Sequence, residues 1–135
     1  NDSAQNIQTL SAIEYAIKVL KIPNLIILGH SNCGGVEYSY KTLLDKKNIN
    51  DFEYINQWTS CLQNSYNNIP NDLPETEKIT FFEQENIKQS IKNLREYDFI
   101  DKSINENKLN VVGLWYQINS GLIKFLDNNS FIDLD

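Results

Sequence analysis

The sequence is poor in several residue types that mark particular classes of protein. Its 135 residues include two cysteines, no methionine and a single histidine. Two cysteines do not make a disulfide framework, so we expect a reducing compartment and a cytoplasmic location. The longest apolar run, Leu25 to Leu28, is far too short to cross a bilayer, and no signal-like segment opens the chain. These absences argue against a disulfide-rich secreted domain and against a membrane protein.

Basic residues are also scarce. Twelve Lys and Arg stand against eighteen Asp and Glu, which gives a formal net charge of −6 at pH 7. Proteins that bind a nucleic-acid backbone or an anionic membrane need a basic face, and none stands out here. We therefore expect neither nucleic acid nor a membrane as a partner.

The apolar content, by contrast, is that of a folded protein. The sequence is 41% hydrophobic and 11% aromatic, which argues against disorder. Its length suits one domain with a sizeable core, and it shows no repeat and no internal boundary. We predict a single domain over residues 1–135.

The first part of the chain predicts a helix followed by a strand. Ser11 to Glu14 is a capping-box pattern, which predicts a helix start, and Pro23 ends the helix. Apolar residues follow Ser11 at helical spacing: Ile13, Ala16, Ile17 and Leu20; an extension of the same face backwards through Leu10 and Ile7 is the alternative start. The run from Leu25 to Leu28 then predicts a strand covered on both faces, as in the parallel sheet of an α/β protein.

The rest of the chain continues this α/β pattern. Apolar spacing predicts helices at 34–44, at 52–62 and from about 74 or 76 to 94, with a short helical turn within 99–107. The Asn-rich segment 64–74 is the best candidate for a loop, and 109–118 is a second strand candidate. We predict a mostly parallel sheet flanked by helices.

One segment, "LIILGHSNCGG", carries the candidate chemistry at the end of the first strand. His30 and Cys33 offer an imidazole nitrogen and a sulfur, both good zinc ligands, and ligands in α/β sheets sit at the carboxyl ends of strands. Gly34 and Gly35 open the next helix, whose N-terminus favours a thiolate. The spacing alone is equally compatible with a packed histidine and cysteine around a simple turn. Two ligands also do not complete a zinc site.

The same segment lies in a longer stretch, "SAIEYAIKVLKIPNLIILGHSNCGGV", that resembles the second half of a beta-class carbonic anhydrase. That family has a helix of the type S-x-x-E-Y-A, a strand, and then G-H-x-x-C-G-G. Further along, "INQWTSCL", "ENIKQSIKNLREYDFI" and "NVVGLWYQINSGLIKFLD" resemble its later segments in the same order. The likeness covers nearly the whole chain.

The resemblance implies a zinc enzyme that reversibly hydrates carbon dioxide to bicarbonate and a proton, and that forms homodimers or higher oligomers. The family holds zinc with two cysteines and one histidine, and His30 and Cys33 match two of these ligands. The backbone N–H of Gly34 would face the substrate or bicarbonate. The other cysteine belongs to an upstream C-x-D-x-R strand, which this sequence lacks. We therefore expect the C-terminal part of such a domain, with no catalytic residue assigned and little or no activity on its own.

Four other residues have plainer interpretations. Cys61 fits a packed helical thiol better than a zinc ligand. Tyr116 matches a tyrosine that lines an inhibitory bicarbonate pocket in one branch of the family, but an ordinary strand tyrosine is the preferred interpretation. Glu83 and Glu85 lie two apart on a helix, facing different sides, and are predicted to be solvated.

Three alternatives to the enzyme remain at this point. One is a non-catalytic zinc or scaffold domain of the same fold. Another is a binding module in which "GHSNCGG" holds a phosphate at the helix N-terminus, although the loop lacks the P-loop order of residues. The third is a chain that folds only with a partner or with its missing half. A C-x-D-x-R motif upstream of Asn1 would favour the enzyme, and its absence would favour the scaffold.

Overall fold

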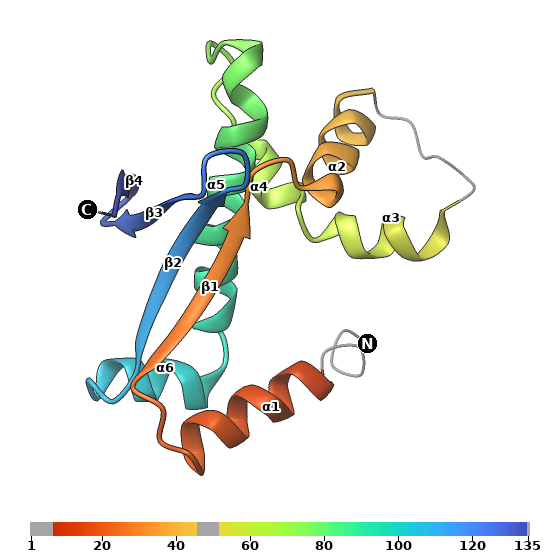
Figure 1. The fold of residues 1–135 in the computed structure, drawn as a ribbon. Helices are drawn as coiled ribbons and strands as arrows, with labels where there is room; N and C mark the ends of the chain where they lie inside the picture. Colours follow the sequence, from red (N-terminus) through yellow and green to blue (C-terminus); the bar gives the residue numbers. More distant parts are fainter. Residues whose placement is uncertain (1–6, 46–51, 135) are drawn as a thin grey trace.

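The computed structural model describes residues 7–45 and 52–134 (Figure 1). In chain order, the helices are α1 (Ile7–Lys18), α2 (Gly34–Asp45), α3 (Glu53–Ser60), α4 (Gln63–Asn67), α5 (Glu75–Leu94) and α6 (Asp98–Asn105). The strands are β1 (Asn24–His30), β2 (Asn110–Gln117), β3 (Leu122–Asp127) and β4 (Ser130–Asp133). Within this described part, no helix combines the length and the apolarity needed to cross a membrane.

The four strands form one mixed sheet in the order β1-β2-β3-β4. β1 and β2 run parallel, with Asn24 opposite Asn110 at one end and His30 opposite Tyr116 at the other. β2, β3 and β4 are antiparallel neighbours, joined by short turns. The α/β class is confirmed, and the parallel arrangement expected from the sequence holds for the β1–β2 pair. The antiparallel hairpins of the C-terminal segment were not predicted.

The predicted capping box at Ser11 is wrong. Helix α1 already begins at Ile7, so Ser11 lies inside it, and its hydroxyl donates a hydrogen bond to the Ile7 carbonyl oxygen at 2.6 Å. A serine within a helix commonly bonds back to the carbonyl four residues earlier instead of capping a new start. The helix end agrees with expectation, because Lys21 takes a positive φ of 55° and Pro23 follows.

The predicted loop at 64–74 is wrong in its first part, which contains helix α4. Leu62, Tyr66 and Ile69 recur at helical spacing and pack into a core between α2 and α5, around Tyr40 and Phe82. The abundance of asparagine along the whole chain weakens asparagine as a turn signal, and it conceals this apolar spacing. The short helix α6, in contrast, largely coincides with the predicted helical turn and begins one residue before the predicted range.

The sheet has one face covered by helices and one open face. Added side chains at Gly29 and Gly113 would meet Ile87 of α5, so these alternate positions face the helices. The intervening residues point the other way, and there Ile26 is 55% exposed and Leu28 is 61% exposed. In Figure 1, α5 runs behind β1 and β2, and no described helix crosses their front. The prediction that the Leu25–Leu28 strand is covered on both faces is therefore wrong for the described structure.

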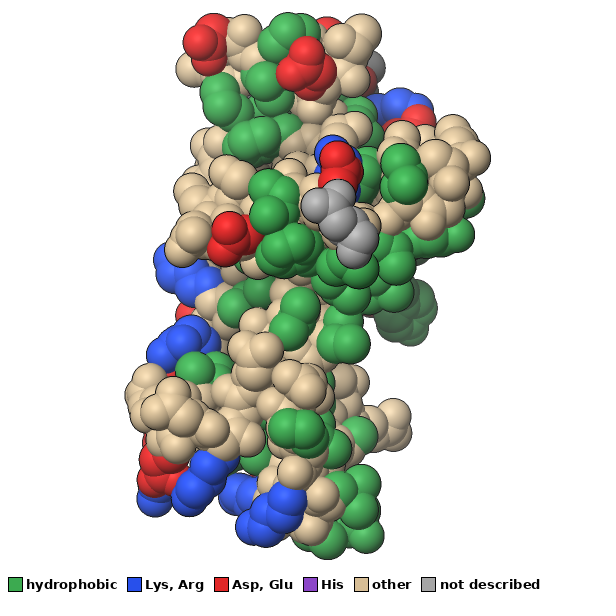
Figure 2. All heavy atoms as spheres, turned by 60° about the vertical axis from the view of Figure 1, so that its left-hand side comes forward, with side chains coloured by type: hydrophobic (Ala, Val, Ile, Leu, Met, Phe, Trp, Pro, Cys, Tyr) green, Lys and Arg blue, Asp and Glu red, His purple; other side chains and the backbone are tan. Residues whose placement is uncertain are grey.

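We call this uncovered side the open face, and its side chains come from all four strands. Strand register places on it Ile26, Leu28, Val112, Leu114, Tyr116, Ile123, Phe125 and Ile132, with His30 at the carboxyl end of β1. Figure 2, a space-filling view turned by 60° from that of Figure 1, shows hydrophobic side chains along much of the molecule. Apolar area of this extent marks a surface that another element or chain covers.

Substitution of Gly29 tests the close approach of β1 to α5. An ideal Cβ at Gly29 would lie 2.6 Å from Cδ1 of Ile87, which is itself buried. Gly29→Ala should therefore lower the free energy of unfolding by about 1–3 kcal/mol, as overpacking in a core does. Chemical denaturation of the full-length protein measures it.

Gly34→Ala serves as the control, because no atom lies within 4 Å of a Cβ added there. Equal stability of Gly29→Ala and the parent protein would contradict the packing described.

Candidate functional site

The candidate site is a tight turn between β1 and α2. β1 ends at His30, and α2 begins at Gly34. Asn32 takes the left-handed backbone conformation, with φ of 57°, and so reverses the chain within two residues. The Cys33 carbonyl accepts the first helical hydrogen bond, from Glu37 N–H at 2.9 Å, so Cys33 holds the N-cap position of α2. His30 and Cys33 thus lie at the two ends of one turn, at the carboxyl end of a strand.

His30 is held in one tautomer by the same turn. Its Nδ1 lies 2.9 Å from the Ser31 carbonyl oxygen, which can only accept a hydrogen bond. Nδ1 therefore carries a hydrogen and donates it, and in the neutral imidazole Nε2 is the nitrogen left to bind a metal. This is the usual arrangement of a histidine that binds a metal through its other nitrogen.

Ser31 ties the turn to the end of β2. Its backbone N–H donates to the Tyr116 carbonyl oxygen at 2.9 Å, which extends the parallel ladder past His30. Its side-chain oxygen accepts the N–H of Ile118 at 2.9 Å. Tyr116 is the register partner of His30, so both side chains stand on the open face at the edge of the turn.

The prediction that Glu83 is solvated is wrong. Its side chain lies on α5 and is only 4% exposed. Oε1 accepts the Cys33 backbone N–H at 3.2 Å, and Oε2 accepts Nε1–H of Trp115 at 3.2 Å. Burial raises the pKa of Glu83, while the hydrogen bonds from Cys33 and Trp115 act in the opposite direction.

A signal for this burial is present in the sequence. Glu83 falls on the apolar stripe of α5, four residues after Ile79 and four before Ile87, and an acid there faces the core. Glu85 also departs from the prediction of a fully solvated acid. Its side chain is 14% exposed and pairs with Lys88 at 3.1 Å.

The prediction that Cys61 is a packed thiol is also wrong. Cys61 is exposed, directly after α3, and its thiol donates to the Trp58 carbonyl oxygen at 2.8 Å. Both cysteines are free. Within residues 7–45 and 52–134, no three His, Cys, Asp or Glu side chains come together as a metal site. The turn therefore offers two donors, His30 and Cys33.

The two glycines of the turn differ in their surroundings. A Cβ at Gly34 would meet nothing within 4 Å, so the space beside its backbone is open. A Cβ at Gly35 would lie 2.3 Å from Cζ3 of Trp58, so Gly35 lets α3 pack closely against α2. Gly35 thus serves packing, whereas Gly34 borders free space.

A hollow of about 570 Å³ adjoins the turn between α2 and α5. Asn32, Glu83, Tyr40 and Glu75 are among the residues that line it. The Tyr40 hydroxyl donates to Glu75 at 2.6 Å. Burial, together with the Glu75 carboxylate, raises the pKa of Tyr40 to about 12, so the tyrosine stays neutral and a donor across the physiological range.

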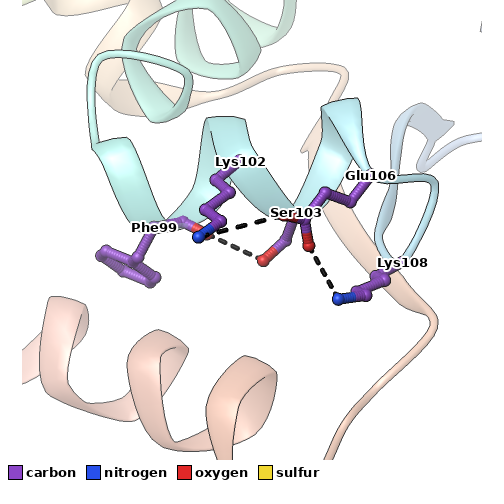
Figure 3. A network of polar contacts seen from close by, with 5 residues as sticks. All are labelled: Phe99, Lys102, Ser103, Glu106 and Lys108. Atoms are coloured by element: carbon purple, nitrogen blue, oxygen red, sulfur yellow. Dashed lines mark hydrogen bonds and ion pairs between the residues drawn. The ribbon is translucent and has the colours of Figure 1, made fainter.

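The lysines gathered on α1 and around the end of α6 do not form a comparable site. Lys18, Lys21, Lys102 and Lys108 line a hollow there. Glu106 pairs with Lys108 at 2.7 Å and Lys102 at 3.9 Å, as Figure 3 shows, and Glu14 pairs with Lys18. Two carboxylates, Glu14 and Glu106, partner three of the four lysines and so offset part of the positive charge at this end.

The comparisons with known proteins agree with the fold. The family model described as carbonic anhydrase matches residues 2–123. Beta carbonic anhydrase 3 of Arabidopsis thaliana is 28% identical over 123 residues, which cover 89% of this chain and 47% of that protein. The chain thus spans about half the length of the curated relatives it matches.

Solved structures agree as well. The beta-carbonic anhydrase CcaA aligns with a TM-score of 0.79 and 25% identity, over 92% of this chain and 61% of that one. One of two tetrameric beta-carbonic anhydrases from Sordaria macrospora aligns with a TM-score of 0.75 and 28% identity, over 96% of this chain and 62% of that one. The family match over most of the sequence and the shared fold together carry the assignment: this chain belongs to the beta-carbonic anhydrase family.

Proposed function

We propose that the full-length protein catalyses the zinc-dependent, reversible hydration of carbon dioxide to bicarbonate and a proton, and that His30 and Cys33 are two of its zinc ligands. The observation that carries the proposal is the turn itself. It sets an imidazole with a free Nε2 and a half-buried thiol at the carboxyl end of β1. These donors fit zinc, which prefers nitrogen and sulfur ligands.

The residues of this chain would bind the metal and the anion. Zinc, when bound, would supply Lewis-acid activation of water. His30 would donate Nε2 and Cys33 its thiolate. The N–H of Gly34 opens α2 beside free space, and the N-terminus of a helix is suited to an anion such as bicarbonate. We assign no catalytic residue.

The site needs further ligands than those described. A catalytic zinc usually has three protein ligands, and the described residues offer two together. We therefore propose that another ligand comes from elsewhere in the full-length protein, and that these 135 residues alone have little or no activity. A non-catalytic zinc or scaffold domain is the second candidate, because the described donor set is incomplete. The free cysteines support a reducing, cytoplasmic location as part of the proposal.

Removing either proposed ligand tests the enzyme. In the full-length protein, His30→Ala and Cys33→Ser should each lower bound zinc from about one per chain to near zero, because too few ligands remain. Carbon dioxide hydration should fall at least about 100-fold. Metal analysis and stopped-flow hydration assays measure the two effects.

Cys61→Ser is the matched control, because Cys61 is an exposed thiol outside the turn. It should keep both zinc and activity. Full zinc and activity in His30→Ala would refute the assignment, while zinc binding by the parent protein without hydration would favour the scaffold.

Gly34→Ala tests the substrate role of that position. The added methyl meets no protein atom within 4 Å, so stability and zinc content should stay unchanged. If bicarbonate occupies the space, kcat/KM for hydration should drop about 10-fold, equivalent to about 1.4 kcal/mol in transition-state binding. Gly35→Ala is the comparator, since its methyl would collide with Trp58 and should reduce stability instead. Unchanged kcat/KM in Gly34→Ala would exclude the proposed contact.

We further propose that the protein is a homo-oligomer whose copies cover the open face. A tetrameric beta-carbonic anhydrase is among the aligned structures. The open face exposes large apolar side chains, whose contact with water is unfavourable. Because β1 has no neighbour on its outer edge among the described strands, a further segment could also add there.

Leu28→Asp tests this assembly. A carboxylate at the centre of a buried apolar interface costs several kcal/mol, so the full-length variant should shift to a smaller mass in light scattering. Leu44→Asp, on α2, changes an equally exposed leucine away from the open face and should keep the parent mass. An unchanged mass for Leu28→Asp would show that copies of the chain do not cover this face.

A further inference from the structure

Glu83 makes contacts that neither the zinc ligands nor the substrate position require. It is one of four polar or charged residues buried among those described, and the only one with an ionisable side chain. Burying a carboxyl is costly unless its oxygens are hydrogen-bonded, and both oxygens of Glu83 are. The donors come from two separate elements, the turn and β2. Through these two hydrogen bonds, Glu83 links α5 to the turn and to β2.

The contact with the turn falls on the backbone of a proposed ligand. Oε1 accepts the N–H of Cys33, and the N–H of Asn32 also faces the Glu83 carboxyl. N–H groups at the start of a helix have no partner within the helix, so α2 receives its cap from α5. Fixing the Cys33 N–H fixes its Cα and limits where its sulfur can lie.

The contact with β2 links Glu83 to His30, the other proposed ligand, only through neighbouring residues. Trp115, which donates to Oε2, is the register partner of Gly29, next to the His30–Tyr116 pair. Trp115 is itself buried, so its indole cannot swing away without disturbing the core. The carboxyl of Glu83 therefore connects β2, the strand paired with the one that ends at His30, with the turn that carries Cys33.

We propose that Glu83 is a positioning residue that holds Cys33 and His30 at ligand spacing before metal binds. This inference rests on the proposed zinc site. Outer partners of this kind orient metal ligands, and their loss typically lowers metal affinity about 10- to 100-fold. Glu83 touches neither substrate nor metal in this role. It acts through the Cys33 backbone and through Trp115.

Glu83→Gln in the full-length protein is the test, because it keeps the shape of the side chain. The amide of Gln has one oxygen, which can accept only one of the two hydrogen bonds. Its NH₂ group is itself a donor, so it cannot accept the second one. In the metal-free protein, hydrogen exchange of the Cys33 amide should become about 5- to 10-fold faster, as for loss of one hydrogen bond. Zinc affinity, from competition with a chelator, should fall about 10-fold or more.

Glu85→Gln is the matched control. Glu85 lies on the same helix and is also partnered, by Lys88 and by Asn68, but it does not contact the turn. It should leave the Cys33 amide and zinc affinity unchanged. Trp115→Phe is the second variant, for use if Glu83→Gln fails to fold. It removes one donor, keeps an aromatic ring in the core, and should also speed Cys33 exchange.

The outcomes separate this inference from the proposed function. Unchanged Cys33 exchange and zinc affinity in a folded Glu83→Gln, or unchanged Cys33 exchange in Trp115→Phe where Glu83→Gln does not fold, would overturn the role of Glu83. If the parent protein binds no zinc, the proposed zinc site is refuted, and the positioning role of Glu83 is refuted with it. Faster exchange with unchanged zinc affinity would mean that Glu83 supports the fold alone, which also overturns the proposal.

Discussion

The close packing of α5 against β1 and β2 is the constraint on which the rest of the structure depends. Ile87 fills the space that two glycines, Gly29 and Gly113, leave in neighbouring strands. Any larger residue at either glycine would push the helix away. One turn earlier on the same helix, this approach brings the Glu83 carboxyl within hydrogen-bond distance of the Cys33 backbone. A packing requirement in the core thus sets the position of a polar contact at the site.

The turn after β1 is held from three directions. The Ser31 backbone and side chain bind the end of β2, Glu83 binds Cys33 from α5, and the Ser31 carbonyl orients His30. Loops are ordinarily the most mobile parts of a fold, and a metal site gains affinity when its ligands need little rearrangement. The hydrogen bonds around this turn would supply such preorganisation to the proposed zinc ligands.

The open face adjoins the turn that carries His30 and Cys33, at the carboxyl end of β1. Ile26 and Leu28 lie exposed along β1, and His30 ends the same row of side chains. Whatever covers the face also approaches the turn, because both lie on one side of one strand. The chain spans about half the length of the curated relatives it matches.

Local patterns in the sequence determined α1, β1, the turn and the long helix α5, because apolar spacing, proline and glycine act on neighbouring residues. The motif around His30 and Cys33 could likewise be recognised in the sequence, since both proposed ligands lie within four positions. Tertiary structure alone decided the hydrogen-bond partners of Glu83, because Cys33 and Trp115 are 50 and 32 residues away. It also decided that β1 has one open face, which an unbroken apolar run cannot distinguish from two covered faces. The apolar periodicity of a segment shows which of its faces carry apolar side chains. Only the packing of the whole chain determines what covers those faces.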